Sequence, residues 1–176
     1  MKSEIIELLK ISGWDDEEAK KTFDRWYNWL VESTKKEDVK QYFNAIEKIE
    51  YDQLVIVKDI DVDLVCPHHL LPVDLIVHIG YLPNGQILGL SKFARVAKAL
   101  SYPQIQEGYT KQLVDIIFEN LKPKWCMAIV IGEHSCMQCR GVRSKNSKTV
   151  TSAIRVPSNY PTKEEHLKRE FMKLVV

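Results

Sequence analysis

The sequence lacks several features that would assign it to other classes of protein. Its 25 lysine and arginine residues nearly balance 24 aspartate and glutamate residues, so the net charge of +1 creates no overall field that would attract nucleic acid or an anionic membrane. The longest apolar runs, such as residues 125–132, are too short to span a bilayer. Residues 1–10 are broken by charges and have no apolar core of a signal peptide, which predicts a soluble, cytoplasmic protein.

Cysteine is also scarce, with four residues among 176. In an intracellular chain of this length, so few cysteines predict thiols or metal ligands and not a disulfide framework. No internal repeat, low-complexity tract or linker interrupts the chain, and its 45% hydrophobic content is enough to bury one sizeable core. We therefore expect residues 51–176 to form one catalytic domain and residues 1–50 to form an N-terminal helical arm.

Hydrophobic periodicity predicts an α+β fold with an antiparallel sheet. Apolar residues at helical spacing predict helices within residues 15–50, the first one capped by Asp15. A turn at residues 83–85 favours a hairpin, and two amphipathic helices follow, the first with Ser91 as its expected N-cap. Strand-like and helix-like patterns predict the remaining elements, which are strands at 54–60, 73–82, 125–131, 134–142 and 149–154 and a helix at 162–173.

The first segment with chemical potential reads Cys66-Pro67-His68-His69. It places a thiol and an imidazole three residues apart in a turn after a strand, a spacing at which both groups can reach one zinc ion. A Cys-x-x-His pair is common in unrelated sequences, so this segment alone is a weak signal.

Residues 133–141 supply a second group of candidate ligands. As a strand, this segment would place His134, Cys136 and Arg140 on one face and Cys139 on the other. The first face would then offer a soft metal ligand between a proton donor and an anion-binding guanidinium group.

Two kinds of metal site can be built from these residues. Cys66, His69 and Cys136 would leave the fourth position of a zinc ion open to water, which is the arrangement of a catalytic site. Addition of Cys139 would instead close a structural Cys₃His site that performs no chemistry. The opposite orientations of Cys136 and Cys139 on a strand favour the open, catalytic site.

His68 and His134 lie beside the candidate ligands and are not needed for ligation. Water bound to zinc loses a proton near neutral pH and becomes a nucleophile, and its attack requires an acid nearby. Both histidines are therefore candidates for proton transfer. The alternative interpretation of each is a hydrogen-bonded core histidine without a chemical role.

Two further segments could bind a nucleotide. Lys92 and Arg95 lie one turn apart at an expected helix start, where exposed N–H groups favour anions, and Arg140 could join them in gripping a polyphosphate. Gln106 and Glu107 open the next helix, where a carboxylate could accept hydrogen bonds from guanine. The alternatives are a solvated basic face and an ordinary first-turn acidic residue.

Four motifs at residues 66–72, 89–95, 104–107 and 134–142 resemble the type I GTP cyclohydrolase family in order and spacing. The resemblance covers about residues 52–154. It implies the tunnelling fold, in which small antiparallel sheets join around a ring of subunits and two pentameric rings stack into a homodecamer. It also implies active sites at subunit interfaces, ring contacts made by the helical arm, and conversion of GTP and water to 7,8-dihydroneopterin triphosphate and formate.

The resemblance implies a role for each candidate residue. It implies a Zn²⁺ site formed by Cys66, His69 and Cys136. It implies that His134 protonates the purine, that His68 assists opening of the ribose and that Ser91 assists the sugar rearrangement. It implies that Gln106 and Glu107 bind the guanine. It also implies that the triphosphate is bound by Lys92, Arg95 and Arg140.

Three features depart from the family pattern. Pro67 stands where the family usually has glutamate, and residues 14–21 lack a Thr-Pro-x-Arg stretch, which leaves that phosphate contact missing or made by a lysine or Arg25. Residues 155–157 read Arg-Val-Pro where many members carry glycine. Two other functions remain open: a nitrile reductase acting on a deazaguanine, and a non-catalytic, zinc-stabilised oligomer. The paired histidines and Cys136 argue against the reductase.

Overall fold

The computed structural model describes residues 1–158 and 164–175. It divides into two compact units, which we name the helical unit (residues 1–35) and the sheet unit (residues 36–176). This division by contacts lies before residue 50, where the sequence predicts the catalytic domain to begin. That functional boundary stays a prediction. No helix in the described part of the chain is both long and apolar enough to cross a membrane.

The helical unit consists of α1 (Lys2–Ile11) and α2 (Asp16–Ser33). The predicted cap is present, because the Asp15 side chain accepts hydrogen bonds of 2.9 Å from the N–H groups of Glu17 and Glu18. Phe23 is buried, yet this small unit leaves large apolar side chains exposed, including Leu8 and Ile11.

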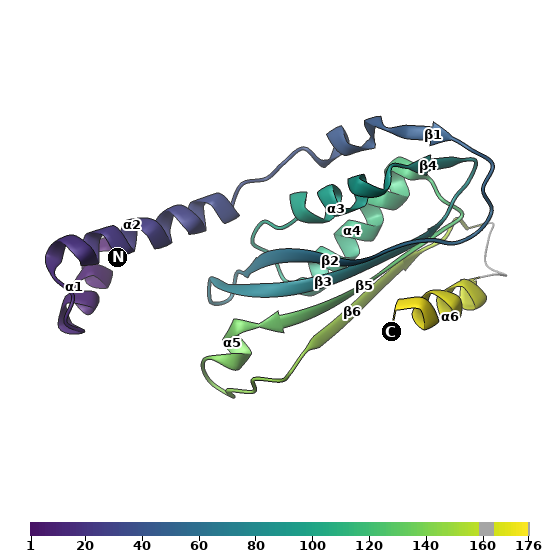
Figure 1. Cartoon of the computed structure of the whole chain (residues 1–176). Coiled ribbons are helices and arrows are strands. Elements are labelled where there is room, and N and C mark those ends of the chain that lie inside the picture. Colours follow the sequence, from purple (N-terminus) through teal and green to yellow (C-terminus); the bar gives the residue numbers. More distant parts are fainter. Residues whose placement is uncertain (159–163, 176) are drawn as a thin grey trace. The chain divides into compact units, whose positions relative to one another are not determined.

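The sheet unit contains two antiparallel sheets (Figure 1). The four-stranded sheet has the order β2-β3-β5-β6, with strands at Val55–Cys66, Leu71–Leu82, Trp125–His134 and Thr149–Arg155. β2 alternates between buried and exposed residues over part of its length, whereas the central strand β5 is buried along most of its length. The two-stranded sheet pairs β1 (Ile46–Lys48) with β4 (Gln86–Leu88).

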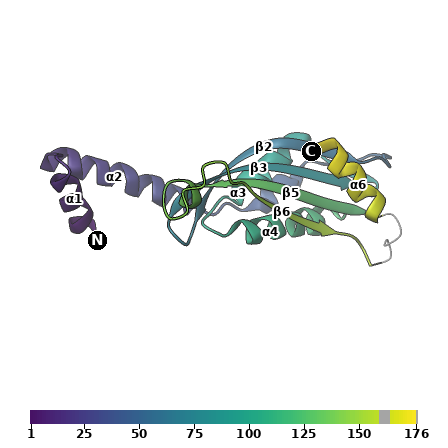
Figure 2. The same ribbon diagram turned by 90° about the horizontal axis from the view of Figure 1, so that it is seen from below.

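Helices cover both faces of the four-stranded sheet. On one face lie α3 (Leu90–Ala99) and α4 (Gln106–Leu121), whose apolar residues share a core with β2, β3 and β5. On the other face lies α6 (Glu164–Val175), which packs through Leu167 and Phe171 (Figure 2). The close approach of α6 requires a glycine in β3, because a Cβ atom at Gly80 would lie 2.6 Å from the Phe171 ring.

The predicted fold class is confirmed: the chain is α+β, with an antiparallel sheet, two helices on one face and N-terminal helices. Three local predictions outside the candidate site are wrong. Residues 39–50 do not form a second long helix but a 3₁₀ helix, η1 (Val39–Asn44), followed by β1, because Ile46 pairs with Leu88. The turn at 83–85 does not close a hairpin, because β4 leaves β3 to pair with β1, while β3 pairs with β2 and β5.

The third wrong prediction concerns the start of α3. Gly89 is the N-cap and the helix begins at Leu90, so Ser91 lies in the first turn and not at the cap. The predicted strands at 73–82, 125–131 and 149–154 are confirmed within longer elements, and the strand predicted at 54–60 is confirmed from Val55 onward. The C-terminal helix is also confirmed as α6, although its expected first residues, 162 and 163, lie outside the described part of the chain.

Candidate active site

Most candidate residues gather at one end of the four-stranded sheet, which we name the His134 end. Cys66 is the last residue of β2 and pairs with Leu71 at the start of β3. His134 is the last residue of β5 and pairs with Val73, two residues further along β3. The segments that follow Cys66 and His134 are therefore neighbours in space although they are far apart in the sequence.

The tight turn after β2 presents the two adjacent histidines differently. It closes through a hydrogen bond of 2.9 Å from the Leu70 N–H to the Cys66 carbonyl. The Cys66 thiol is buried, and its sulfur lies 3.6 Å from Nδ1 of His68. The Arg140 guanidinium instead donates to Nε2 of His69. Hence His68 lies against the thiol, whereas His69 joins this turn to the segment after β5.

The segment after β5 is not the strand that the sequence predicts over residues 134–142. β5 ends at His134, and Ser135–Gln138 form one helical turn, α5. The backbone bonds are local here: the Cys139 N–H donates to the Ser135 carbonyl over 2.9 Å, and the Ser144 N–H donates to the Met137 carbonyl over 2.8 Å. The neighbouring strand offers no alternative, because the pairing of β6 with β5 begins only at Thr149, opposite Gly132.

This turn changes the relation between two cysteines. On a strand Cys136 and Cys139 would face opposite ways, but residues three apart on a helical turn share one side. Cys136 is half-buried and Cys139 is exposed. The orientation argument that favours a three-ligand site over a closed Cys₃His site therefore fails, and the choice between the two sites needs an experiment.

Gln106, the first residue of α4, ties this helix to His134 and is 1% exposed. Its amide nitrogen donates to the carbonyls of Val130 (3.0 Å) and Thr149 (3.1 Å) and to the Thr151 hydroxyl (3.1 Å). Two of these partners can only accept, which fixes the amide orientation. Gln106 Oε1, 2.8 Å from Nε2 of His134, must therefore accept from an Nε2–H group, and this leaves Nδ1 of His134 to exchange protons.

The contact between Gln106 and His134 depends on a glycine in β5. A Cβ atom at Gly132 would lie 2.2 Å from Gln106 Oε1. This positioning role of Gln106 and Gly132 was not part of the sequence-based prediction. A single glycine within a β-branched strand is the signal that marks a close approach of another group.

Burial governs the charge state of His134. Partial burial lowers the pKa of this imidazole, and the carboxylate of Glu107 acts in the opposite direction. Glu107 follows Gln106 in the first turn of α4, where it is exposed. The exposed carboxylate is therefore close enough to favour the protonated imidazole electrostatically.

Two predicted residues, Ser91 and Lys92, lie elsewhere, because α3 starts near the other end of the sheet. α4 runs about 24 Å at 1.5 Å per residue from Gln106, which contacts His134, to Leu121. The carbonyl of Leu121 accepts a hydrogen bond of 2.7 Å from Gln86 in β4, and β4 leads directly into α3. Within one chain the start of α3 is thus separated from the His134 end. This start carries Ser91 and Lys92. Arg95 lies one turn further on, in the half of α3 that leads to Gln104, whose N–H donates to the carbonyl of Val65 next to Cys66.

The donor set at the His134 end suits zinc by type. Two thiols and an imidazole from neighbouring segments, Cys66, Cys136 and His69, are groups that zinc prefers. They do not already converge, because within residues 1–158 and 164–175 no three His, Cys, Asp or Glu side chains are close enough to hold a metal ion. Metal binding would require His69 to exchange its contact with Arg140 for the ion, or to use its other nitrogen.

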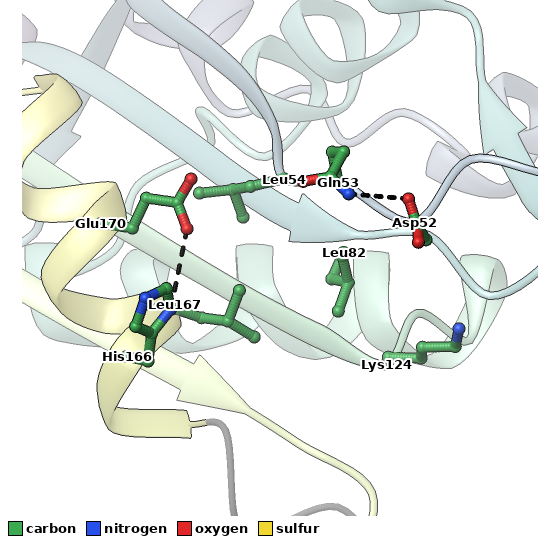
Figure 3. Close-up of a pocket in the computed structure, with 8 residues that line it drawn as sticks. All are labelled: Asp52, Gln53, Leu54, Leu82, Lys124, His166, Leu167 and Glu170. Atoms are coloured by element: carbon green, nitrogen blue, oxygen red, sulfur yellow. Dashed lines mark hydrogen bonds and ion pairs between the residues drawn. The ribbon is translucent and has the colours of Figure 1, made fainter.

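A separate cavity of about 560 Å³ lies beside α6 (Figure 3). Its polar lining carries mixed charge, with Nδ1 of His166 3.9 Å from a Glu170 carboxylate oxygen and the Gln53 amide donating to Asp52 over 2.7 Å. Lys124, which directly precedes β5, also lines it. It contains none of the predicted site residues and lies where β5 begins, away from the His134 end.

Comparison with known proteins gives three findings. A family model described as GTP cyclohydrolase I matches residues 1–176. GTP cyclohydrolase 1 of Geobacillus kaustophilus is 45% identical over 121 residues, which are 68% of this chain and 64% of that protein. GTP cyclohydrolase 1 of Homo sapiens is 50% identical over 112 residues, which are 63% of this chain and 45% of that protein. The chain thus aligns with less than two thirds of the length of either relative.

Among solved structures, the apo form of the archaeosine synthase QueF-Like aligns with a TM-score of 0.50 and 17% sequence identity. The alignment covers 61% of this chain and 100% of that one. At this identity the likeness concerns the fold alone.

Proposed function

Because the chain belongs to the GTP cyclohydrolase I family, we propose that it converts GTP and water to 7,8-dihydroneopterin triphosphate and formate. The observation that best supports this activity is the placement of His134. It stands at the end of β5, held through Nε2 by the buried Gln106 and flanked by Cys136, across from the turn that carries Cys66 and His68. Release of formate from GTP tests the proposal.

The proposed metal ligands are Cys66, His69 and Cys136. Zinc supplies the Lewis acidity that makes water a nucleophile at neutral pH, here toward C8 of the purine. The chain contributes two thiols from the end of β2 and the α5 turn, and it holds His69 beside Arg140. We place the protein in the cytoplasm, where reducing conditions keep such thiols available.

The proposed acid is Nδ1 of His134, which protonates the imidazole ring of GTP. Gln106 keeps the proton of the imidazole on Nε2, so the ring cannot turn without losing a hydrogen bond of 2.8 Å. We therefore assign Gln106 to positioning His134, because its amide nitrogen already has three acceptors within 3.1 Å. The predicted guanine contact then falls to Glu107, whose carboxylate can accept from N1–H and the amino group, two donors that adenine does not present together.

We propose that another copy of the chain supplies part of the phosphate-binding site. Ser91, Lys92 and Arg95 are carried by α3 and its start is distant from His134, whereas Arg140 is at the His134 end. The edge strands of the four-stranded sheet, β2 and β6, can pair between copies and close a ring. We therefore propose a homodecamer of two pentamers, with active sites at subunit interfaces. In each site Ser91 assists the sugar rearrangement and His68 assists opening of the ribose. The exposed apolar residues of the helical unit suit the ring contacts proposed for the arm.

The α5 turn supports a second candidate function, a non-catalytic zinc-stabilised oligomer. In that case Cys139 would act as a fourth ligand beside Cys136, on the same side of the turn. The two functions differ in the number of protein ligands, so they make opposite predictions about Cys139.

We expect Cys136→Ser and His69→Ala to reduce zinc from about one ion per chain to near zero, because each removes one of three ligands. Cys139→Ser should retain the metal, and His68→Ala should retain it as well. Metal analysis of dialysed protein measures these contents, with circular dichroism as the check on folding. If Cys139→Ser lost zinc as completely as Cys136→Ser, the closed structural site would be correct and the catalytic proposal would fail.

A further inference from the structure

The α5 turn brings together two solvent-accessible thiols. Cys136 is half-buried, Cys139 is exposed, and both are free. The hydrogen bond from the Cys139 N–H to the Ser135 carbonyl closes the turn, so the two side chains leave it on one side, three residues apart. The proposed chemistry uses only the first of these thiols and leaves Cys139 without a role.

Helix geometry places two side chains three residues apart only slightly further from each other than a disulfide requires. Residues three apart on a helix have Cβ atoms about 5–6 Å apart, whereas a disulfide places them about 3.5–4.5 Å apart. Only one helical turn has to tighten, and it leads into an exposed loop in which Gly141 and Arg143 have φ angles of 56° and 51°. Formation of the bond therefore leaves the sheet and its core in place.

The other two cysteines are less suited to oxidation. Cys126 is fully buried in β5, and Cys66 is 5% exposed at the end of β2 with its sulfur against His68. Oxidants in solution need access to a thiol, and burial denies them that access. The accessible pair is thus the one on α5.

We propose that Cys139 is a resolving cysteine for Cys136, so that a hydroperoxide converts the two thiols reversibly into a disulfide. Cys136 attacks the peroxide oxygen and becomes a sulfenic acid, with release of one water or alcohol molecule. The Cys139 thiol then attacks the sulfenic sulfur, forms the S–S bond and releases water. The peroxide is reduced by two electrons, and a dithiol returns these electrons when it reduces the disulfide.

The consequence for activity rests on the proposed zinc site. A disulfide removes Cys136 from the ligand set, so oxidation releases the metal and stops turnover until the bond is reduced. Without Cys139 the sulfenic acid would react with more peroxide and become a sulfinic acid, which thiols cannot reduce. Cys139 therefore makes the oxidation of a ligand reversible and protects the site from permanent loss.

The test compares the wild-type protein with Cys139→Ser, with Cys126→Ala as the matched control. Each reduced, zinc-loaded protein is treated with hydrogen peroxide and then with dithiothreitol. Peptide mass spectrometry identifies disulfides and sulfinic acid, and a coloured chelator records zinc release. At about 100 µM peroxide we expect the disulfide to exceed sulfinic acid about tenfold in the wild type, because a neighbouring thiol acts at an effective concentration of about 1 mM.

In the wild type and in Cys126→Ala, dithiothreitol should restore the Cys136 thiol and zinc binding. In Cys139→Ser, sulfinic acid at Cys136 should accumulate, and dithiothreitol should restore neither the Cys136 thiol nor zinc binding. A bond between Cys66 and Cys136, or equal recovery in Cys139→Ser, would overturn the inference. GTP turnover of the reduced proteins is measured separately. A mapped Cys136–Cys139 disulfide in a protein without turnover would contradict the proposed function and leave the redox pair standing.

Discussion

His134→Ala should lower formate release from GTP by about 10²–10⁴-fold, the usual contribution of a general acid or base. The same variant should retain its zinc and its affinity for GTP, because His134 is proposed neither as a ligand nor as a phosphate contact. The loss of activity is expected because the hydrogen bond to Gln106 holds the imidazole by Nε2 and leaves Nδ1 for the proton transfer. Single-turnover formate release, measured beside metal content and nucleotide binding, checks all three statements.

His68→Ala provides the matched comparison, since His68 also lies beside a proposed ligand. If its main task is the ribose, this variant should still open the imidazole ring and accumulate an uncyclised intermediate or its formyl precursor. Full formate release from His134→Ala would remove His134 from the role of acid. If metal binding required His68 and not His69, the assignment within this pair would be reversed. The contact between His68 and the Cys66 thiol is the reason to test both histidines.

The second large effect comes from mixing two inactive variants. His134→Ala damages the His134 end of each chain, and Lys92→Ala damages only the start of α3. If each active site combines one half from each of two neighbouring copies, random co-assembly restores about a quarter of the sites in a symmetric ring. Each variant alone should turn over GTP at least about 10²-fold more slowly than the wild type.

Coexpression of the two chains with different affinity tags, followed by purification through both tags, provides the mixed oligomer. The control mixture pairs His134→Ala with His68→Ala, which damage the same half and should not raise formation of the pterin above the average of the two parents. The first mixture could instead turn over GTP no faster than the average of its two parents. That result would show that both halves of the site lie within one chain, and it would contradict the separation argued from the length of α4.

The sequence predicts the secondary structure best where local and long-range preferences agree. Segments rich in β-branched and other apolar residues indicate β2, β3, β5 and β6. Asp15 caps α2, as its position before a helical pattern predicts. The pattern fails where a distant partner decides the structure. Residues 46–48 continue a helical spacing, but pairing with β4 makes them a strand.

The candidate site shows the same limit. The motifs identify which residues gather at the His134 end, but residues 135–138 carry no periodic signal that distinguishes a strand from a single helical turn. The contact between Gln106 and His134 joins residues 28 positions apart and depends on the missing side chain of Gly132. The separation of Ser91 and Lys92 from His134 follows from the direction of two helices, which spacing along a sequence does not reveal.

The most direct measurement is incubation of the zinc-loaded protein with GTP while formate and the absorbance of the pterin are followed together, with ATP in a parallel reaction. We predict equal amounts of formate and dihydroneopterin triphosphate from GTP, at matching rates after any initial lag, and neither product from ATP. Absence of formate from GTP under conditions in which the protein is folded, reduced and loaded with zinc would contradict the proposed activity.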